Sequence, residues 1–199
     1  SFPIIISYQQ NLSSPKSVFK NMDEKTKKIL ESLNSKKVGV FCDDSNLFHA
    51  YKKYGWRVDF EKLRKLLEKY CNLQFINYHI AIPDKSDDVF RGTETFLPKL
   101  APYVNLKKKL LKYTPVAGKF MKKADVDVEI TLDIVRNIDN LDVIIIMSGD
   151  SDFLELKNYV TKDKNKSILF MSYEENMAWE LRQCWHLYIN RIKDEIGLK

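Results

Sequence analysis

The stretch VIIIMSGDSDF, from Val143 to Phe153, indicates the fold more strongly than any other part of this sequence. Five consecutive apolar residues lead directly into a serine, a glycine and then Asp150 and Asp152. A short apolar run bounded by turn-forming residues is typical of a buried β-strand. We therefore predict a buried strand that presents Asp150 at its carboxyl end.

Strand-like and helix-like segments alternate through the rest of the chain from Lys37 onward. Strands that alternate with helices predict crossover units, and hence a mostly parallel sheet with helices on both faces. The predicted fold class is therefore α/β. Strands are predicted at 37–43, 73–82, 109–116, 141–148 and 167–172, and helices at 45–55, 59–70, 87–100, 125–138, 150–162 and 174–184.

The chain divides into two unequal parts. Residues 1–35 are predicted to form an N-terminal extension with one short helix at 21–34, and residues 36–199 to form one domain. No apolar run reaches the roughly 18 residues that a membrane span requires, so we expect no membrane partner. The three cysteines are far apart and odd in number, which favours a reducing compartment such as the cytoplasm.

Several aspartates fall at predicted strand ends and helix starts. Asp43 ends the first strand and Asp150 the strongest one, and ligand sites of parallel sheets lie at the carboxyl ends of strands. An aspartate after a strand also commonly caps the next helix, and for either residue alone the two interpretations are about equally good. The complete group is harder to explain by capping: Asp43, Asp44, Asp125, Asp127, Asp133, Asp150 and Asp152.

A cluster of carboxylates needs a cation or a shared proton. Two like charges about 4 Å apart repel by roughly 4 kcal/mol at an effective dielectric of about 20. Aspartate oxygens suit Mg²⁺ or Mn²⁺, whereas the three histidines show no paired spacing for zinc. The sequence also contains no glycine-rich phosphate loop and no G-x-S-x-G nucleophile elbow.

Three short motifs occur along the chain in the order VFCDDSN, ADVDVEITLD and SGDSDF. They resemble, in the same order, the opening motif, the central helix motif and the third motif of NYN domains, a branch of the PIN-like nuclease superfamily. The resemblance covers roughly Lys37 to Asn190 and is closest to the LabA-like group. It implies a three-layer α/β/α sandwich and metal-dependent RNA cleavage.

The resemblance also implies roles for individual residues. It assigns metal binding to Asp43, Asp127 and Asp150, with Asp152 as a further catalytic acid that binds the metal or positions water. Asn46 and Ser148 become supporting polar groups. Asp133 matches a second acid of the helix motif and is expected to support the site from behind the metal ligands.

A basic segment precedes the central helix motif. No acid occurs from Thr95 to Ala124, while aromatic residues are interleaved with lysines. Such a segment suits single-stranded RNA, with charge for phosphates and rings for bases; a solvated basic surface is an equally good interpretation. The candidate RNA-binding residues are Lys107, Lys108, Lys109, Lys112, Lys119, Lys122 and Lys123.

The function predicted from the sequence is a ribonuclease that hydrolyses single-stranded RNA with Mg²⁺ or Mn²⁺ as cofactor. The net charge of +6 is a mild lean toward such a polyanionic partner. Two alternatives remain open. The same fold could bind RNA or a partner protein without cleaving, or the acids could serve a phosphatase or a DNA nuclease.

Overall fold

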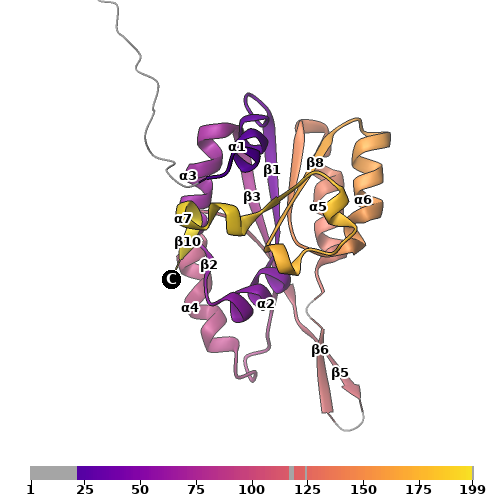
Figure 1. The fold of residues 1–199 in the computed structure, drawn as a ribbon. Coiled ribbons are helices and arrows are strands. Elements are labelled where there is room, and N and C mark those ends of the chain that lie inside the picture. Colours follow the sequence, from indigo (N-terminus) through magenta and orange to yellow (C-terminus); the bar gives the residue numbers. More distant parts are fainter. Residues whose placement is uncertain (1–21, 117–118, 124, 199) are drawn as a thin grey trace, which may run out of the picture.

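A computed structural model describes residues 22–116, 119–123 and 125–198, without the side chains of Val116, Lys119 and Phe120. Its centre is a six-stranded sheet in which every neighbouring pair is parallel (Figure 1). The predicted parallel α/β fold is therefore confirmed. In spatial order the strands are β4 (Asn105–Leu110), β3 (Asn72–Ile82), β1 (Lys37–Asp43), β7 (Val143–Met147), β8 (Ser167–Ser172) and β9 (His186–Tyr188).

Helices cover both faces of this sheet and complete three layers (Figure 1). Successive strand residues point to opposite faces, so Val40 and Cys42 of β1 join one hydrophobic core and Phe41 joins the other. The first core is covered by α1 (Glu24–Glu31), α2 (Asp44–Tyr54), α3 (Phe60–Tyr70), α4 (Phe90–Leu100) and α7 (Lys193–Ile196), and the second by α5 (Asp127–Asn137) and α6 (Leu154–Asn158).

The strand order reverses direction between β1 and β7. From β1 the chain builds one half of the sheet through β3 and β4, and from β7 it builds the other half through β8 and β9. The carboxyl ends of two strands at such a switch point diverge into separate helices and leave a crevice between them. Asp43 is the last residue of β1 and Asp150 follows β7, which is the arrangement that the sequence predicts.

Smaller elements surround the sheet. A hairpin of β5 (Lys112–Val116) and β6 (Lys119–Lys123) projects away from the body (Figure 1), and β2 (Arg57–Val58) pairs with β10 (Gly197–Leu198). The predicted strand at 109–116 thus corresponds to the end of β4 and the first arm of the hairpin. The short turns are η1 (Ile138–Asn140), η2 (Ser151–Phe153), η3 (Tyr159–Asp163), η4 (Glu174–Asn176), η5 (Leu181–Gln183) and η6 (Ile189–Ile192).

The helix predicted at 174–184 is wrong. This segment contains only the two short turns η4 and η5, with Met177 in an extended conformation between them. The backbone N–H of Ala178 donates to Gly149 O at 2.9 Å instead of to a carbonyl one helical turn earlier. A tertiary contact to the end of β7 therefore overrides the helical pattern of the sequence.

The N-terminal helix α1 packs onto the body of the protein. Leu30 and Leu33 are fully buried in the core that also contains α3. Residues 1–21, which carry most of the predicted extension, lie outside the described residues, so the domain boundary at residue 36 stays a prediction.

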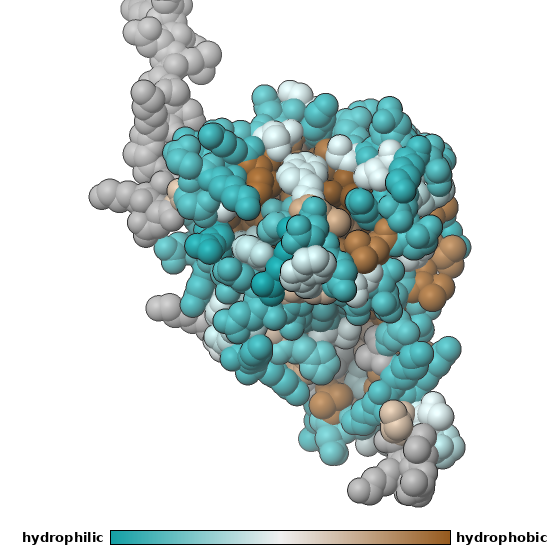
Figure 2. Space-filling view, turned by 45° about the vertical axis from the view of Figure 1, so that its right-hand side comes forward, coloured by the Kyte–Doolittle hydropathy of each residue, from teal (hydrophilic) through white to brown (hydrophobic). Residues whose placement is uncertain are grey.

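Hydrophilic side chains dominate the face of the protein in Figure 2, and hydrophobic ones form separate patches between them. Among the described residues, no helix combines the length and the hydrophobicity that crossing a bilayer requires.

Candidate metal centre

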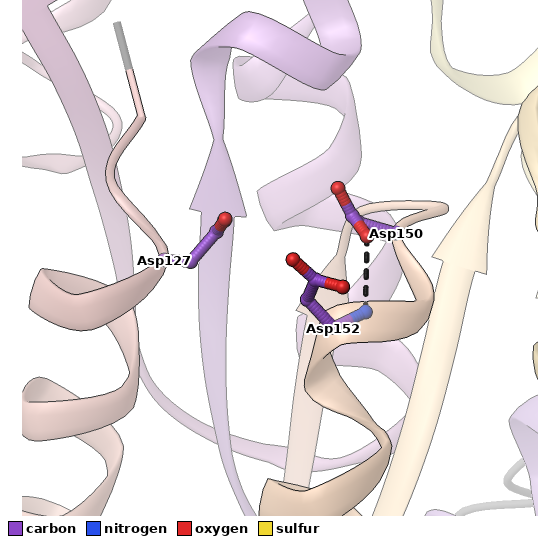
Figure 3. A group of neighbouring side chains, drawn as sticks. All are labelled: Asp127, Asp150 and Asp152. Atoms are coloured by element: carbon purple, nitrogen blue, oxygen red, sulfur yellow. Dashed lines mark hydrogen bonds between the residues drawn. The ribbon is translucent and has the colours of Figure 1, made fainter.

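Three aspartates meet at the carboxyl end of the sheet. Asp127, Asp150 and Asp152 each offer a carboxylate oxygen, and these oxygens lie within 4.8 Å of one another. Figure 3 shows Asp127 approaching from the start of α5, while Asp150 and Asp152 come from the turn after β7. We call these three residues the acid trio.

Local hydrogen bonds shape the turn that carries two members of the trio. Asp150 caps the turn η2, and its carboxylate accepts a hydrogen bond of 3.0 Å from the backbone N–H of Asp152 (Figure 3). Both residues therefore lie on a tight turn directly after a rigid buried strand. Asp152 is exposed, whereas Asp127 and Asp150 are half-buried, so the trio is open to solvent on one side.

Asp127 is the first residue of α5, where unpaired backbone N–H groups add partial positive charge. Its own N–H donates to the Asp125 carboxylate at 3.1 Å. Burial, followed by the negative charges of Asp43 and Asp125, raises the pKa of the Asp127 carboxyl from 3.8 to about 7. The helix terminus thus only partly compensates for the crowding of acids.

The acid trio has the donor set that a hard divalent cation prefers. Two carboxylates 4.8 Å apart repel by at least about 3 kcal/mol at an effective dielectric of about 20. Lys123 pairs with Asp125 at 3.4 Å, but among the described residues no lysine or arginine forms an ion pair with a member of the trio. Three oxygen ligands without a cationic partner fit Mg²⁺ or Mn²⁺.

Asp43 lies beside the trio but is more deeply placed. Its side chain is buried, and its oxygens accept hydrogen bonds from the Ser45 hydroxyl at 2.8 Å, the Asn46 N–H at 3.3 Å and the Ser148 hydroxyl at 3.1 Å. Its negative charge still acts on Asp127. The group of oxygens within 4.8 Å includes Asp152 and not Asp43, and the role of Asp43 in metal binding stays a prediction.

Asn46 and Ser148 hold the two strand ends together. The Asn46 side-chain oxygen accepts from the Gly149 N–H at 3.1 Å and from the Asn176 amide at 3.0 Å. Ser148 donates to Asp43 and accepts from the Asp150 N–H at 3.3 Å. These bonds fix the turn that carries Asp150 relative to the end of β1.

The backbone at Asn176 approaches Gly149 so closely that only glycine fits at this position without a shift of the neighbouring chain. A Cβ atom there would lie 2.1 Å from the carbonyl oxygen of Asn176. A side chain at residue 149 would therefore push the segment at 174–178 away from the trio.

Asp133 lies in a buried polar network. It accepts hydrogen bonds from the amides of Asn77 at 2.7 Å and Asn137 at 3.0 Å, and His79 Nε2 lies 3.1 Å away. Burial raises the pKa of Asp133, but the hydrogen bonds from His79 and Asn77 and the charge of Lys107 outweigh it and hold the pKa below its usual 3.8. This residue connects α5 to the sheet rather than to the cation site.

The predicted basic segment adjoins the trio through Asp125 and Glu129. Lys109 bonds to the Asp125 carbonyl and to the Glu129 carboxylate, both at 2.7 Å. Lys107 pairs with Asp133 at 3.8 Å and Lys122 with Asp87 at 2.8 Å.

The remaining lysines of the segment differ in what surrounds them. Lys123 pairs with Asp125, whereas Lys108 and Lys112 are exposed and have no acidic partner among the described residues. The side chain of Lys119 lies outside the described part of the chain. The role of these lysines in RNA binding stays a prediction.

Two residues of the site were missed by sequence reasoning. The Ser45 hydroxyl donates to Asp43, although its place beside a strand end indicates only a helix cap. Asn176 is 130 positions from its partner Asn46, and no local pattern in the sequence connects them. Only the folded arrangement of the β1 and β7 ends reveals either contact.

Comparisons with known proteins agree with this arrangement. The model of the family described as NYN domain matches residues 37–190. The low amplitude and bright protein LabA of Synechococcus elongatus is 26% identical over 159 residues, which cover 77% of this chain and 83% of that protein. The resemblance predicted from the three motifs is thus confirmed.

A solved structure shares the fold. The crystal structure of a protein of unknown function from Vibrio parahaemolyticus matches with a TM-score of 0.63 and 20% identity, covering 83% of this chain and 98% of that one. Together with the sheet and its two helical layers, this match confirms the three-layer α/β/α architecture.

Proposed function

Because the chain belongs to the NYN domain family, which is part of a nuclease-like superfamily, we propose that it is a ribonuclease that hydrolyses single-stranded RNA with Mg²⁺ or Mn²⁺. The observation that carries this proposal is the acid trio. Three carboxylates converge at the switch point of a parallel sheet without an ion-pair partner among the described residues. Such crowding is unfavourable unless a cation is part of the working site.

Some residues of this site would hold the ion, and others fix the position of the turn that carries it. When bound, the ion would be held by Asp127, Asp150 and Asp152, with Asp43 as the further ligand that the family resemblance implies. It would supply Lewis-acid stabilisation of the charge that develops on the phosphate. Asp152, the most exposed of the three, faces solvent, from which the attacking water comes. Asn46 and Ser148 hold the turn in place, and Asp43 anchors the start of α2.

Lysines of the basic segment support an RNA substrate. Lys108 on β4 and Lys112 at the base of the hairpin are exposed cations without acidic partners among the described residues. Exposed lysines neutralise phosphates without regard to base sequence. We therefore place part of the RNA strand along β4 and the β5–β6 hairpin.

The state of the cysteines supports a proposal for the cell compartment in which the protein works. Cys42, Cys71 and Cys184 are all free. Free thiols are typical of proteins in a reducing compartment, so we propose that the protein works in the cytoplasm.

The test is a cleavage assay with four labelled substrates: single-stranded RNA, duplex RNA, single-stranded DNA and duplex DNA. Each is incubated with purified protein in Mg²⁺, in Mn²⁺ or in EDTA, with Asp152→Asn as the matched variant that keeps side-chain shape. We expect single-stranded RNA to be cleaved fastest, only with a divalent ion, and much more slowly by the variant.

Two other outcomes would assign a different function to this protein. Preferred cleavage of DNA would replace the ribonuclease with a DNA nuclease on the same acids. Salt-sensitive RNA binding without cleavage in any metal would contradict the enzyme and identify an RNA-binding module.

A further inference from the structure

A cavity lies on the α2 side of the sheet and is lined by Asp44, the residue next to Asp43. It has a volume of about 450 Å³ and lies among α2, α4 and β3. We propose that this cavity binds a nucleobase of the RNA strand, and that an exocyclic amino group of the base donates to Asp44. This inference rests on the proposed function, because it names the part of the substrate that the site recognises.

The Asp44 carboxylate is only half satisfied. One oxygen accepts a hydrogen bond from the Tyr78 hydroxyl, and no described residue donates to the other. Both groups line the cavity, whose other walls are mostly apolar. The free oxygen faces the cavity, so a ligand that displaces water from it must supply a donor in the place of that water.

The donor that fits is an N–H group on a flat, mostly apolar molecule. The Tyr78 hydroxyl already donates its hydrogen bond to Asp44, so this end of the cavity offers acceptors. Adenine, cytosine and guanine carry exocyclic amino groups. Uracil offers only a ring N–H between two carbonyl oxygens, which the acceptors at this end of the cavity would repel. Carboxylates are known partners of such amino groups on bases.

Aromatic groups at the cavity suit stacking on a base. Phe48 lines it with 45% of its surface exposed. The Arg57 guanidinium lies 4.4 Å from the centre of the Tyr51 ring and 5.8 Å from that of Phe96. Unstacked RNA bases bind to aromatic rings and to guanidinium planes of this kind.

The end of β1 connects this cavity to the acid trio. Asp43 lies on the α5 side, where its charge acts on Asp127, and the adjacent Asp44 bonds to Tyr78 on the α2 side. Consecutive Cα atoms are only about 3.8 Å apart. An RNA strand that crosses the end of β1 can therefore place a phosphate at the trio and a neighbouring base in the cavity.

Gly92 on α4 provides a way to fill the cavity from its rim. It lines the cavity, and a Cβ atom at this position would meet no heavy atom within 4 Å. Gly92→Phe should therefore fill the space without disturbing the core, and Gly92→Ala is the matched control. Asp44→Asn keeps the shape of the carboxylate but presents an amide.

The first measurement uses a ten-nucleotide oligouridylate and three versions in which the central uridine is replaced by adenosine, cytidine or guanosine. We expect kcat/KM with Mn²⁺ to rise roughly tenfold with the substituted strands, as one directed hydrogen bond to a base gives. Cleavage should occur at a fixed distance from the substitution. Gly92→Phe and Asp44→Asn should lose this preference while still cleaving the all-uridine strand, and Gly92→Ala should keep it.

The second measurement does not depend on cleavage. Amide NMR spectra of metal-free protein are recorded with AMP and with UMP, and AMP should shift signals of α2 and α4 in the wild type and in Asp150→Asn, but not in Gly92→Phe. Failure of all cleavage together with this AMP response would reject the ribonuclease and keep the base site. Equal cleavage of the four strands, or an AMP response that survives in Gly92→Phe, would overturn the base site and leave the cavity to another kind of ligand.

Discussion

Asp150 has two roles that are usually treated as alternatives. It caps the turn η2 by accepting the Asp152 N–H, and it also contributes an oxygen to the acid trio. A capping carboxylate uses one oxygen for the backbone and keeps its other oxygen available. The common structural role of an aspartate after a strand therefore prepares this residue for a cation site instead of excluding one.

At Asp127, burial and the neighbouring acids predict a pH dependence of stability without metal. Its pKa is raised from 3.8 to about 7, so the folded protein binds this proton more tightly than the unfolded chain. The resulting stabilisation is complete below about pH 4 and is lost as the pH rises through about 7. In EDTA we expect the Tm of Asp127→Asn to exceed that of the wild type by roughly 2 to 4 °C at pH 8, and by less at pH 5, after discounting for solvent screening.

Saturating Mn²⁺ provides the control for this prediction. The ion stabilises only a protein that binds it, so it should raise the Tm of the wild type above that of Asp127→Asn. Parallel curves of Tm against pH for the two proteins, with or without Mn²⁺, would contradict the assignment of the raised pKa to Asp127.

Gly149 gives a second prediction for a single residue. Gly149→Ala places a methyl group 2.1 Å from the Asn176 carbonyl oxygen, so the segment at 174–178 must move. We expect the free energy of unfolding to fall by about 1 to 3 kcal/mol, the usual range for overpacking. Gly92→Ala, whose added atom meets nothing within 4 Å, should leave stability unchanged or raise it slightly. Urea denaturation of both variants tests the pair, and equal losses would show that the approach of Asn176 is not the cause.

The helix α5 carries two aspartates with separate surroundings. Asp127 and Asp133 are six residues apart, which places them about 120° apart around the helix. Asp127 belongs to the trio, while Asp133 accepts hydrogen bonds from Asn77 on β3 and from Asn137 one turn further along the same helix. The first acid belongs to the proposed chemistry and the second to the attachment of the helix to the sheet.

Substitution of Asp133 should therefore affect stability more than cleavage. Asp133→Ala leaves buried donors without an acceptor, which costs about 3 kcal/mol in the free energy of unfolding. We expect the folded variant to retain Mn²⁺-dependent cleavage within about tenfold of the wild-type rate. A stable variant that is as inactive as Asp150→Asn would instead show that Asp133 acts in the chemistry.

The strand β4 predicts different behaviour for neighbouring lysines. Lys109 is bound to the start of α5, whereas Lys108 on the same strand is exposed without an acidic partner among the described residues. Lys108→Ala should lower the slope of log affinity against log salt by about 0.7 for single-stranded RNA, because one phosphate contact is lost. Lys109→Ala should instead lower Tm. Unchanged slopes in Lys108→Ala, measured by fluorescence anisotropy, would identify β4 as a solvated surface only.

At the scale of the whole molecule, hydrophobic runs predict the fold well because they are local. The apolar run before Asp150 specifies β7, and similar runs specify β1, β3 and β8 at nearly their observed bounds. The placement of Asp43 and Asp150 at one edge follows from parallel topology, which brings the carboxyl ends of β1 and β7 together. These features need no knowledge of distant contacts.

The features that sequence reasoning missed depend on distant contacts. The segment at 174–184 has the periodicity of a helix, but Ala178 bonds to Gly149 and Asn176 to Asn46. Likewise, the burial of Asp43 depends on the Ser148 hydroxyl, which is 105 positions away. The cavity beside Asp44 is lined by both α2 and α4, and no motif in the sequence indicates that these two helices lie at the same cavity.

The most direct test of the account measures the cleavage rate of single-stranded RNA as a function of Mn²⁺ concentration for the wild type and for Asp150→Asn. Circular dichroism first establishes that both proteins are folded. The account predicts no cleavage in EDTA, a saturable rise with Mn²⁺ for the wild type, and at most a small fraction of that rate for the variant at every concentration. Cleavage by wild-type protein in EDTA, or a full rate from folded Asp150→Asn, would contradict the claim that the acid trio holds the ion on which catalysis depends.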